Sequence, residues 1–459
     1  MSERFDVIVI GAGQAGPAIA ARCGKEGMKT ALIERDQMGG TCVNNGCIPT
    51  KTLVASARVA ALARRAAEYG VMLDQPLRID MHAVKARKDG IVQASRTGVA
   101  NWMANMKNIS VIHGHARFTS AREIDIGGRT LAADKIFINV GGRPTVPTLT
   151  GIDGVPYLTN ISMMDVDFVP AHLIVIGGSY VGLEFAQIYR RFGAEVTLCE
   201  MGPRLIGRED EDVSDEIRAI LEREGIAVRT GATCLDVKPS GSGIAVGVAC
   251  DSGTPKIDGS HLLLATGRSP NTDDLGLNRA GIVTDARGFI TVNDQLETSV
   301  SGVYALGDVN GRGAFTHTSW NDYEIVAANL FDSGARRVSD RINAYALFTD
   351  PPLGRVGMSF NEARATGRPL LAAKMPMTRV GRAREAGETQ GFMKIVVDAE
   401  SKRILGAALL GLSGDEVVQS ILEVMYADQP YTLINRGMHI HPTVTELIPT
   451  LLEGLKPLK

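Results

Sequence analysis

The stretch Phe5-Asp-Val-Ile-Val-Ile-Gly-Ala-Gly-Gln-Ala-Gly16 decides the fold of the N-terminal part of this chain. Its apolar run predicts a short buried strand, and the pattern Gly-x-Gly-x-x-Gly follows at once. An alanine-rich helical stretch to about Gly24 comes next, and Thr30–Glu34 predicts a second strand that ends in an acid. A lone glycine pattern is weak evidence, but one placed between a strand and a helix indicates a dinucleotide-binding βαβ unit.

Each residue of this motif has a physical role. Gly11 forms the tight turn, and Gly13 lets the backbone approach a pyrophosphate. Gly16 allows the helix to pack closely on the strand, while Glu34 can bind the hydroxyls of a ribose. A βαβ unit that binds no nucleotide is the alternative interpretation.

The same pattern recurs in the middle of the chain. A strand over His172–Ile176 leads into Gly-Gly-Ser-Tyr-Val-Gly at 177–182, then a helix, then a strand that ends at Glu200. Ser179 stands at the middle glycine position, which leaves the backbone slightly less room to approach a pyrophosphate. Because strand, helix and terminal acid are all present, the repeat predicts two dinucleotide folds in one chain.

Glu200 also bears on the choice of nucleotide. A carboxylate can accept hydrogen bonds from a free ribose 2′-OH and would repel a 2′-phosphate, which favours NADH over NADPH. Arg204 and Arg208 lie nearby in the sequence, and either could reach a 2′-phosphate. NADPH is therefore kept as the alternative.

A second feature is the stretch Gly39-Gly-Thr-Cys-Val-Asn-Asn-Gly-Cys-Ile-Pro-Thr-Lys51, with cysteines at 42 and 47. Pro49 favours a helix start here, because proline is tolerated in the first turn of a helix. Backbone N–H groups and the helix dipole at such a start favour a thiolate, which is a better nucleophile and electron donor. Two buried structural cysteines are the alternative. We expect this helix to run to about Ala67, and another helix over about 80–106.

The composition is ordinary for a globular protein, with 44% hydrophobic and 22% charged residues. A length of 459 residues predicts several domains rather than one core. The formal net charge of −2 gives no reason to expect binding to nucleic acid or to a membrane. No apolar run reaches the length of a membrane span, and no signal peptide opens the chain. The six cysteines, at 23, 42, 47, 199, 234 and 250, are too scattered for a secreted disulfide scaffold, so we expect a cytoplasmic protein.

The remaining candidates lie further along the chain. The stretch from Thr298 to Leu306 predicts a strand, and Asp308 follows it where an acid can bind a hydroxyl of a second cofactor. From Asp350 the sequence changes to mixed strands and helices without a glycine motif, which indicates a further domain. Near its end, His441 and Glu446 suit a general base with an orienting carboxylate, a capped surface turn being the alternative.

Metal binding is not expected from the sequence. His113 and His115 alternate in a predicted strand region, but no thiolate or cluster of acids lies near them. A pair of this kind is more often structural, and we predict no bound metal.

Taken together, the two dinucleotide folds, the cysteine pair and the His–Glu pair resemble the FAD-dependent pyridine nucleotide–disulfide oxidoreductases. This family includes glutathione reductase, dihydrolipoamide dehydrogenase and mercuric reductase, and the resemblance covers essentially the whole chain. It implies an α/β enzyme with two Rossmann-like dinucleotide-binding domains and a C-terminal α+β dimerisation domain. The implied domains are FAD-binding (1–145 and 272–342), NAD(P)H-binding (146–271) and dimerisation (343–459).

The resemblance also implies roles for individual residues. Cys47 would face the flavin and form the charge-transfer pair, and Cys42 would be the interchange thiol that meets the substrate. Lys51 would pair with Glu184 beside the reactive nitrogen of the flavin. Tyr180 would cover the flavin until a nicotinamide displaces it.

A homodimer is implied as well, in which His441 and Glu446 serve the cysteines of the partner subunit. The residues implied to bind FAD are Gly11, Gly13, Gly16, Glu34, Gly40, Thr41, Lys51 and Asp308. Those implied to bind NAD(P)H are Gly177, Gly178, Ser179, Tyr180, Gly182 and Glu200, and Ala116 and Gly267 complete the cofactor-binding set.

The substrate is less well defined by the resemblance. His441 and Glu446 fit dithiol–disulfide chemistry, in which a base must protonate a departing thiolate, so electron transfer between NAD(P)H and a small-molecule disulfide is the leading hypothesis. Residues 315–319 and 351–357 look closest to a mercuric-reductase-like bacterial branch, which also includes the oxidoreductase of the reactive-chlorine response. A reductase for a soft metal ion, Hg(II) or Cu(II), is the alternative, although the tail Leu452–Lys459 has no cysteine pair to deliver Hg(II). A redox-sensing flavoprotein with little turnover is a third hypothesis.

Overall fold

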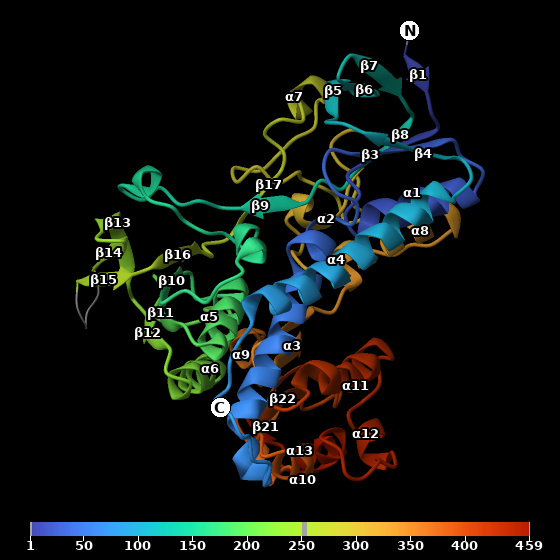
Figure 1. The fold of residues 1–459 in the computed structure, drawn as a ribbon. Helices are drawn as coiled ribbons and strands as arrows, with labels where there is room; N and C mark the ends of the chain where they lie inside the picture. Colours follow the sequence, from blue (N-terminus) through green and yellow to red (C-terminus); the bar gives the residue numbers. More distant parts are fainter. Residues whose placement is uncertain (1, 250–254, 459) are drawn as a thin grey trace.

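The computed structural model describes residues 2–249 and 255–458, and Cys250 lies outside the described residues (Figure 1). A five-stranded parallel sheet forms the N-terminal part. Val7, Val9 and Leu32 lie on one face of this sheet, against helices α1 (Ala15–Lys25), α4 (Met81–Ala104) and α8 (Thr316–Phe331). In spatial order the strands are β18 (Val303–Ala305), β8 (Lys135–Ile138), β2 (Val7–Ile10), β3 (Thr30–Glu34) and β4 (Ile109–His113).

The opposite face of this sheet is covered by a small second sheet. Ile8, Ile10 and Ile33 point to that side and share a core with Phe118 and Ile124. Because successive strand residues face opposite sides, a continuous apolar run such as Val7–Ile10 serves both layers. The covering sheet has the order β1 (Glu3–Arg4), β7 (Arg129–Ala132), β6 (Glu123–Ile126) and β5 (Arg117–Ser120).

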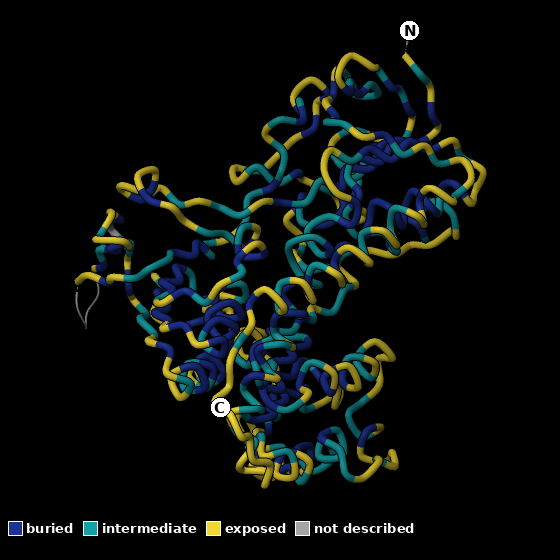
Figure 2. The backbone as a smooth tube through the Cα atoms, in the orientation of Figure 1, coloured by how far each residue is buried: buried dark blue, intermediate teal, exposed yellow. Residues whose placement is uncertain are grey.

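The middle of the chain repeats this three-layer arrangement. Its four-stranded parallel sheet packs helices α5 (Tyr180–Phe192) and α6 (Glu211–Arg223) on one face. A small antiparallel sheet covers the other face, and Figure 2 shows the strands between these layers as buried segments. The parallel strands are β12 (Ala227–Arg229), β11 (Glu195–Cys199), β10 (His172–Ile176) and β16 (His261–Leu264), and the covering strands are β13 (Thr233–Ser240), β14 (Gly243–Ala249) and β15 (Lys256–Gly259).

The first glycine of each motif has the same backbone conformation. Gly11 has φ 99° and Gly177 has φ 114°, in the region that favours glycine. A Cβ at Gly11 would lie 2.4 Å from the Asn139 carbonyl oxygen, and one at Gly177 would lie 2.3 Å from that of Ala265. The repeat in the sequence is therefore a repeat in backbone geometry.

The C-terminal part is built on a six-stranded antiparallel sheet. Helices α11 (Gly414–Tyr426) and α13 (Ile448–Glu453) share its apolar core, which includes Ile395 and Leu409. In spatial order the strands are β19 (Ala344–Leu347), β20 (Leu353–Gly357), β23 (Ile404–Leu410), β22 (Phe392–Asp398), β21 (Leu370–Pro376) and β24 (Lys456–Pro457). Shorter elements are β9 (Gly142–Pro144), β17 (Arg268–Pro270), α7 (Leu277–Ala280), α9 (Phe360–Ala365), α10 (Gly381–Glu385) and α12 (Thr432–Arg436).

The cysteine stretch forms two helices rather than one. Helix α2 (Gly40–Asn44) ends before Gly46, and α3 (Cys47–Arg64) then begins at the second cysteine. The predicted helix start beside Pro49 is present at Cys47, the preceding helix α2 was not predicted, and α3 ends at Arg64, short of the expected Ala67. The strand expected over Thr298–Leu306 is also shorter and covers only Val303–Ala305. Helix α3 reaches from the cysteines to the C-terminal part, where Arg58 pairs with Glu388 at 2.6 Å (Figure 1).

No helix within the described ranges is long and apolar enough to cross a membrane.

Candidate active site

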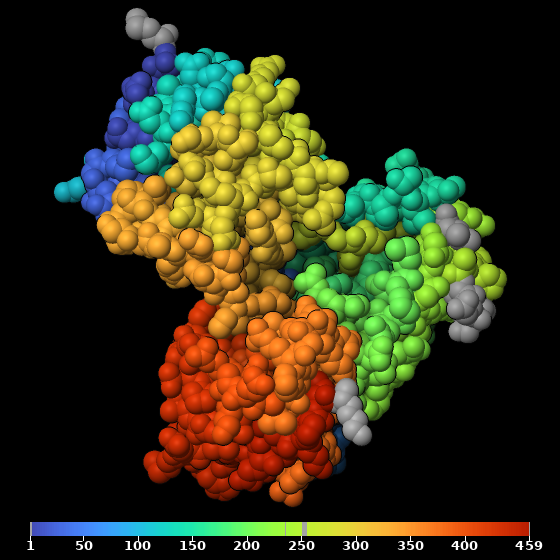
Figure 3. All heavy atoms as spheres, turned by 180° about the vertical axis from the view of Figure 1, so that it is seen from behind, coloured from blue at the N-terminus to red at the C-terminus, as the bar shows by residue number. Residues whose placement is uncertain are grey.

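A cavity of about 2130 Å³ extends between the two glycine motifs and the cysteine stretch. Figure 3 shows, from behind, the hollow where the parts coloured yellow, green and orange meet. The cavity brings together segments that are far apart in the sequence. Its lining includes Gly11, Glu34, Cys42, Cys47, Gly177 and Glu200.

The two cysteines of this site are chemically unequal. Cys47 is the first residue of α3, and its Sγ lies 3.1 Å from Thr316 Oγ1. A hydrogen bond from Cys42 lowers the pKa of Cys47 to about 6, and Thr316 and the charge of Lys51 act in the same direction against burial. The same hydrogen bond and burial raise the pKa of Cys42. With both sulfurs reduced, the pair therefore holds one thiolate, on Cys47, and one thiol, on Cys42.

The hydrogen bond between the two cysteines predicts that alanine and serine at position 42 have different effects on the pKa of Cys47. Alanine removes the hydrogen bond to Cys47, so the pKa of Cys47 should rise well above the value of about 6. Serine keeps a donor at the same position and should leave the pKa of Cys47 lower than alanine does. The measurement is the thiolate absorbance of the reduced protein as a function of pH, and thiolate is lost as pH falls through the pKa. Equal pKa values in the two variants would contradict the proposed hydrogen bond.

Lys51 and Glu184 form an ion pair beside the cysteines. Lys51 Nζ lies 2.8 Å from Glu184 Oε2 and 3.0 Å from Oε1. The Glu184 side chain is only 6% exposed, and its Oε1 also accepts a hydrogen bond of 3.1 Å from the Phe348 backbone N–H. Lys51 lies 4.5 Å from the centre of the Phe348 ring. Helices α3 and α5 thus hold a fixed positive charge at the cavity wall.

The acids that end the two second strands make equivalent contacts. Glu34 Oε2 accepts a hydrogen bond of 2.7 Å from the backbone N–H of Ala12, and Glu200 Oε2 accepts one of 2.6 Å from Gly178. In each case the donor is the residue after the first glycine of the motif. Each carboxylate is thereby held at the mouth of its glycine turn, where a ribose would lie.

Asp308 lies at the end of the N-terminal sheet, close to Arg268. Arg268 Nε is buried without a hydrogen bond among the described residues and lies 3.5 Å from Asp308 Oδ2. Arg268 Nη2 also donates to Thr41 Oγ1 at 3.4 Å. Burial raises the pKa of Asp308, and the Arg268 charge opposes this. Arg268 and Asp308 form a polar cluster on the cavity wall, in which Arg268 Nε is a donor without an acceptor among the described residues.

Tyr180 lies at the start of α5 among other aromatic side chains. Its ring is nearly perpendicular to those of Phe315 and Tyr345, with centroids 5.6 Å and 5.7 Å away. The guanidinium of Arg208 lies 5.7 Å from the Tyr180 ring centre. The Tyr180 hydroxyl is buried and has no hydrogen-bond partner within the described part of the chain.

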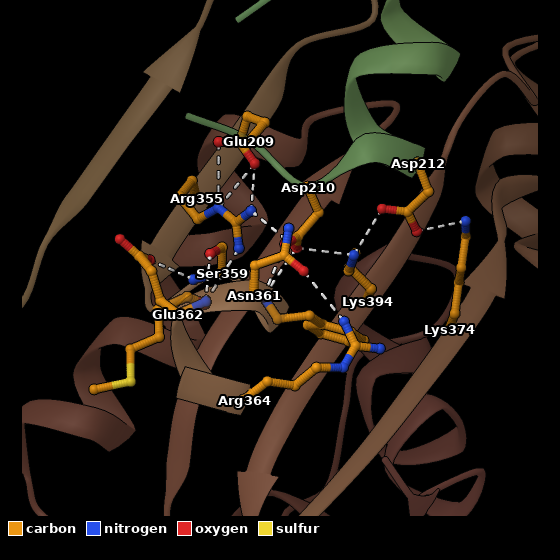
Figure 4. Close-up of polar contacts among 12 residues, drawn as sticks. Glu209, Asp210, Asp212, Arg355, Ser359, Asn361, Glu362, Arg364, Lys374 and Lys394 are labelled. Carbon is orange, nitrogen blue, oxygen red and sulfur yellow. Dashed lines mark hydrogen bonds and ion pairs between the residues drawn. The ribbon is translucent and has the colours of Figure 1, made fainter. Parts of the chain in front are cut away.

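An ionic network runs from the buried Glu209 to the partly exposed Lys374, and Figure 4 shows its members. Glu209, fully buried, pairs with Arg355 on β20, and the Tyr345 hydroxyl donates to the same carboxylate. Next to this pair, Lys394 lies 2.9 Å from Asp210. Asp212 extends the network to Lys374 at 2.7 Å. The network joins the loop after Glu200 to the C-terminal sheet and fixes the Tyr345 ring against Tyr180.

His441 and Glu446 meet each other but lie apart from the cysteines. His441 Nδ1 is 2.9 Å from Glu446 Oε2, and Arg382 donates to the Pro442 carbonyl oxygen at 2.7 Å and steadies the loop. The His441 side chain is 79% exposed, and its polar contacts within the described chain are with Glu446 alone. A single chain therefore presents this pair outward and does not bring it to the cavity.

Other predicted residues take the following positions. Ala116 is buried on the cavity wall, and Gly267 lines the cavity with φ 115°. Ser179 is exposed. Gly40 touches the first motif, since a Cβ there would lie 2.7 Å from the Gly13 Cα. Across residues 2–249 and 255–458, no group of His, Cys, Asp and Glu side chains has the arrangement of a metal site.

Several residues of the site were not singled out from the sequence. Asn139 Oδ1 accepts a hydrogen bond from the Gly16 N–H at 2.9 Å, and its Nδ2 donates to the Leu306 carbonyl oxygen. The apolar residues Ile136, Phe137 and Ile138 directly before it were the available signal. Thr316 and Arg268 carried no comparable local signal, because their contacts are with residues far away in the sequence.

The comparisons with known proteins agree with this geometry. Residues 5–322 match the family described as pyridine nucleotide-disulphide oxidoreductase, and residues 343–452 match the dimerisation domain of the same family. The chain therefore belongs to the pyridine nucleotide-disulphide oxidoreductases and is an FAD-dependent oxidoreductase that uses NAD(P)H. The resemblance inferred from the sequence and the expected fold class are confirmed.

Three relatives illustrate the range of the family. The probable pyridine nucleotide-disulfide oxidoreductase RclA of Escherichia coli is 33% identical over 99% of this chain and 100% of its own length. A structure of RclA as a Cu(II) complex, described as an HOCl-induced flavoprotein disulfide reductase, has a TM-score of 0.89 and covers 97% of this chain and 99% of RclA. Dihydrolipoyl dehydrogenase of Thermus scotoductus is 34% identical over 99% of this chain and 96% of its own. Mercuric reductase of Lysinibacillus sphaericus is 30% identical over 99% of this chain and 82% of its own.

Proposed function

We propose that this enzyme passes electrons from NADH to a small-molecule disulfide through Cys42 and Cys47. The observation that carries the proposal is the unequal pair, a thiol on Cys42 beside a thiolate on Cys47, next to the Lys51–Glu184 ion pair. A structural pair of cysteines has no need for this difference in protonation.

The first glycine motif and its surroundings fit FAD. The glycine turn leaves room for a pyrophosphate, Glu34 is held where a ribose would lie, and Arg268 has an unused buried donor beside Asp308. We assign Gly11, Gly13, Gly16, Glu34, Gly40, Thr41, Lys51, Ala116 and Asp308 to this cofactor. When bound, FAD would supply two-electron chemistry between a nicotinamide and the thiols. The domain division into 1–145 with 272–342, 146–271 and 343–459 is part of the same proposal.

The second motif, with Gly177, Gly178, Ser179, Tyr180, Gly182, Glu200 and Gly267, is assigned to the nicotinamide nucleotide. The position of Glu200 favours NADH over NADPH at this site. Glu200 stands at the glycine turn, where it would repel a 2′-phosphate. Arg204 is paired with Glu211 at 2.5 Å, and Arg208 lies over the Tyr180 ring. Arg204 keeps a buried Nε without a hydrogen-bond partner among the described residues, so the preference for NADH is carried by Glu200.

The protonation states of Cys42 and Cys47 indicate which sulfur attacks in each step of disulfide reduction. Cys42, as a thiol, must lose a proton before it attacks the acceptor disulfide and releases the first thiol. Cys47 then attacks the Cys42 sulfur, which expels the second thiolate and leaves a Cys42–Cys47 disulfide. The exposed His441, oriented by Glu446, is the base and acid that these steps require, and we assign it to the cysteines of a partner subunit in a homodimer.

Replacement of His441 by glutamine tests this assignment. The rate of disulfide reduction should fall by about 10²-fold or more, because proton transfer at Cys42 loses its general base. Reduction of the bound FAD by NADH should keep its wild-type rate, since His441 does not contact that part of the site. Stopped-flow absorbance of the flavin and a steady-state assay with the disulfide acceptor measure the two steps separately. An unchanged steady-state rate would refute the assigned role of His441.

A second candidate function is reduction of a soft metal ion. The observation in its favour is that the similar protein RclA has been solved as a Cu(II) complex. The described residues contain no preformed metal site, so Cu(II) or Hg(II) would have to bind the Cys42–Cys47 thiols themselves. Thiolate sulfur suits both ions.

One experiment separates these functions. Holoenzyme is supplied with NADH or NADPH and, in parallel, with lipoamide, glutathione disulfide, Cu(II), Hg(II) or a quinone. We expect one disulfide to give the highest kcat/KM, and NADH to exceed NADPH with that acceptor. Turnover with a metal ion and with none of the disulfides would replace the first proposal by the second.

A further inference from the structure

A second pair of thiols lies beside the other glycine motif. Cys199 is the last residue of β11 and is 1% exposed, whereas Cys234 lies near the start of β13 and is half-buried. Their side chains are in hydrogen-bond contact and belong to the same apolar cluster. Both residues line the large cavity, so an oxidant that enters the cavity reaches this pair.

The backbone of Cys199 is part of the nucleotide cradle. Its carbonyl oxygen accepts a hydrogen bond of 2.8 Å from the Gly177 N–H, and the next residue is Glu200. The segment that enters β13 is tied to the same place, because the Ala232 N–H donates to the Glu200 carbonyl oxygen at 2.9 Å. A change in the spacing of Cys199 and Cys234 therefore acts on the glycine turn and on the ribose-binding acid.

Formation of a disulfide starts at the sulfur that loses its proton more easily, and Cys199 and Cys234 differ in this respect. The hydrogen bond from Cys199 lowers the pKa of Cys234, which is also the more exposed of the two residues. Cys23 provides a contrast, because burial raises its pKa to about 12. Cys234 is thus suited to react first with an oxidant, and Cys199 is suited to resolve the product.

We propose that Cys199 and Cys234 form a reversible disulfide under a peroxide-class oxidant and that this disulfide weakens binding of the nicotinamide nucleotide. The Cys234 thiolate takes one oxygen atom from hydrogen peroxide, which gives sulfenic acid and hydroxide. The Cys199 thiol then attacks that sulfur, so an S–S bond forms and water leaves. Two thiols are oxidised, one peroxide is reduced, and a dithiol reagent reverses the change.

The weaker binding follows from the geometry of a disulfide. Its S–S bond is about 2.05 Å, much shorter than a hydrogen-bond contact between two sulfurs. Any backbone adjustment that accompanies bond formation falls on the end of β11 and the start of β13, where the register is already irregular between Cys234 and Asp236. This part of the inference rests on the assignment of the second motif to the nicotinamide nucleotide, whereas formation of the disulfide does not.

The test has a chemical and a binding readout. Wild-type holoenzyme is treated with hydrogen peroxide, alkylated, digested and searched by mass spectrometry for a peptide that joins Cys199 to Cys234. Binding is measured by calorimetry with NAD⁺ in a Cys42→Ser/Cys47→Ser holoenzyme, so that the first thiol pair plays no part. The matched control carries Cys234→Ser in addition, and each protein is compared with its own untreated sample.

We expect the joined peptide in the wild type, with Cys23 still alkylated. We also expect the Kd for NAD⁺ to rise at least ~5-fold after peroxide and to return with dithiothreitol, with no peroxide effect in the Cys234→Ser control. Alkylation of both Cys199 and Cys234 after peroxide, or a joined peptide with an unchanged Kd, would overturn the proposal. Untreated protein that does not bind NAD⁺ would instead refute the nucleotide assignment, and the peptide result would still stand.

Discussion

Serine in place of Cys42 is expected to lower the rate of NADH-driven disulfide reduction by about 10³-fold or more. A hydroxyl cannot form the mixed disulfide with the acceptor, so no route remains for the electrons at this site. The serine hydroxyl can still donate a hydrogen bond to Cys47, which keeps the thiolate on that residue. Reduction of the bound FAD by NADH should therefore continue for a single turnover and then stop.

The measurement compares that single turnover with the steady state. Stopped-flow absorbance follows the flavin, and consumption of NADH with the preferred disulfide gives the steady-state rate. Cys23→Ser is a suitable control, since Cys23 is a buried thiol of the N-terminal core that lies outside the site. A Cys42→Ser protein that keeps most of its steady-state rate would show that the acceptor receives electrons elsewhere.

Methionine in place of Arg355 is expected to destabilise the fold by roughly 3–5 kcal/mol. The substitution leaves the Glu209 carboxylate inside the protein without its cation, and the Glu209 and Arg355 side chains are 0% and 2% exposed. Asp210, which lies 3.6 Å from Arg355, loses a partner as well. The urea midpoint, followed by circular dichroism, should fall accordingly.

A double variant separates lost charge from lost packing. Glu209→Gln combined with Arg355→Met removes both charges and keeps an acceptor for the Tyr345 hydroxyl, so it should recover much of the lost stability. The exposed pair Arg4–Asp134 is the control, and Arg4→Met should change stability little. If Arg355→Met were as mild as Arg4→Met, the buried pair would not hold the C-terminal sheet to the nucleotide unit.

The parts of this molecule that were predicted from sequence depend on neighbours in the chain. The glycine turn at Gly11 and its copy at Gly177 each need a backbone conformation that few residues adopt, so the pattern itself carries the information. The continuous apolar run Val7–Ile10 likewise indicates a strand buried on both faces. The unequal environment of the two cysteines followed in part from the helix start at Cys47.

The rest depends on contacts that no local pattern encodes. Glu209 and Arg355 are 146 positions apart, and nothing in either segment indicates the other. The break between α2 and α3 arises from Gly46, where a Cβ would lie 2.8 Å from the Thr41 carbonyl oxygen. His441 faces outward from its own chain. In the proposal the cysteines that it serves belong to a second subunit, so only the family resemblance could indicate them.

The two glycine turns differ in what lies over them. The cysteine segment covers the first, since Gly40 packs on Gly13 and the Gly39 N–H donates to the Ala12 carbonyl oxygen at 2.9 Å. Ser179, at the equivalent place in the second, is exposed. Under the proposed assignment, the same glycine turn therefore holds one nucleotide for a long time and the other briefly. The first nucleotide leaves only if the cysteine segment moves. The second can exchange with solvent in every cycle.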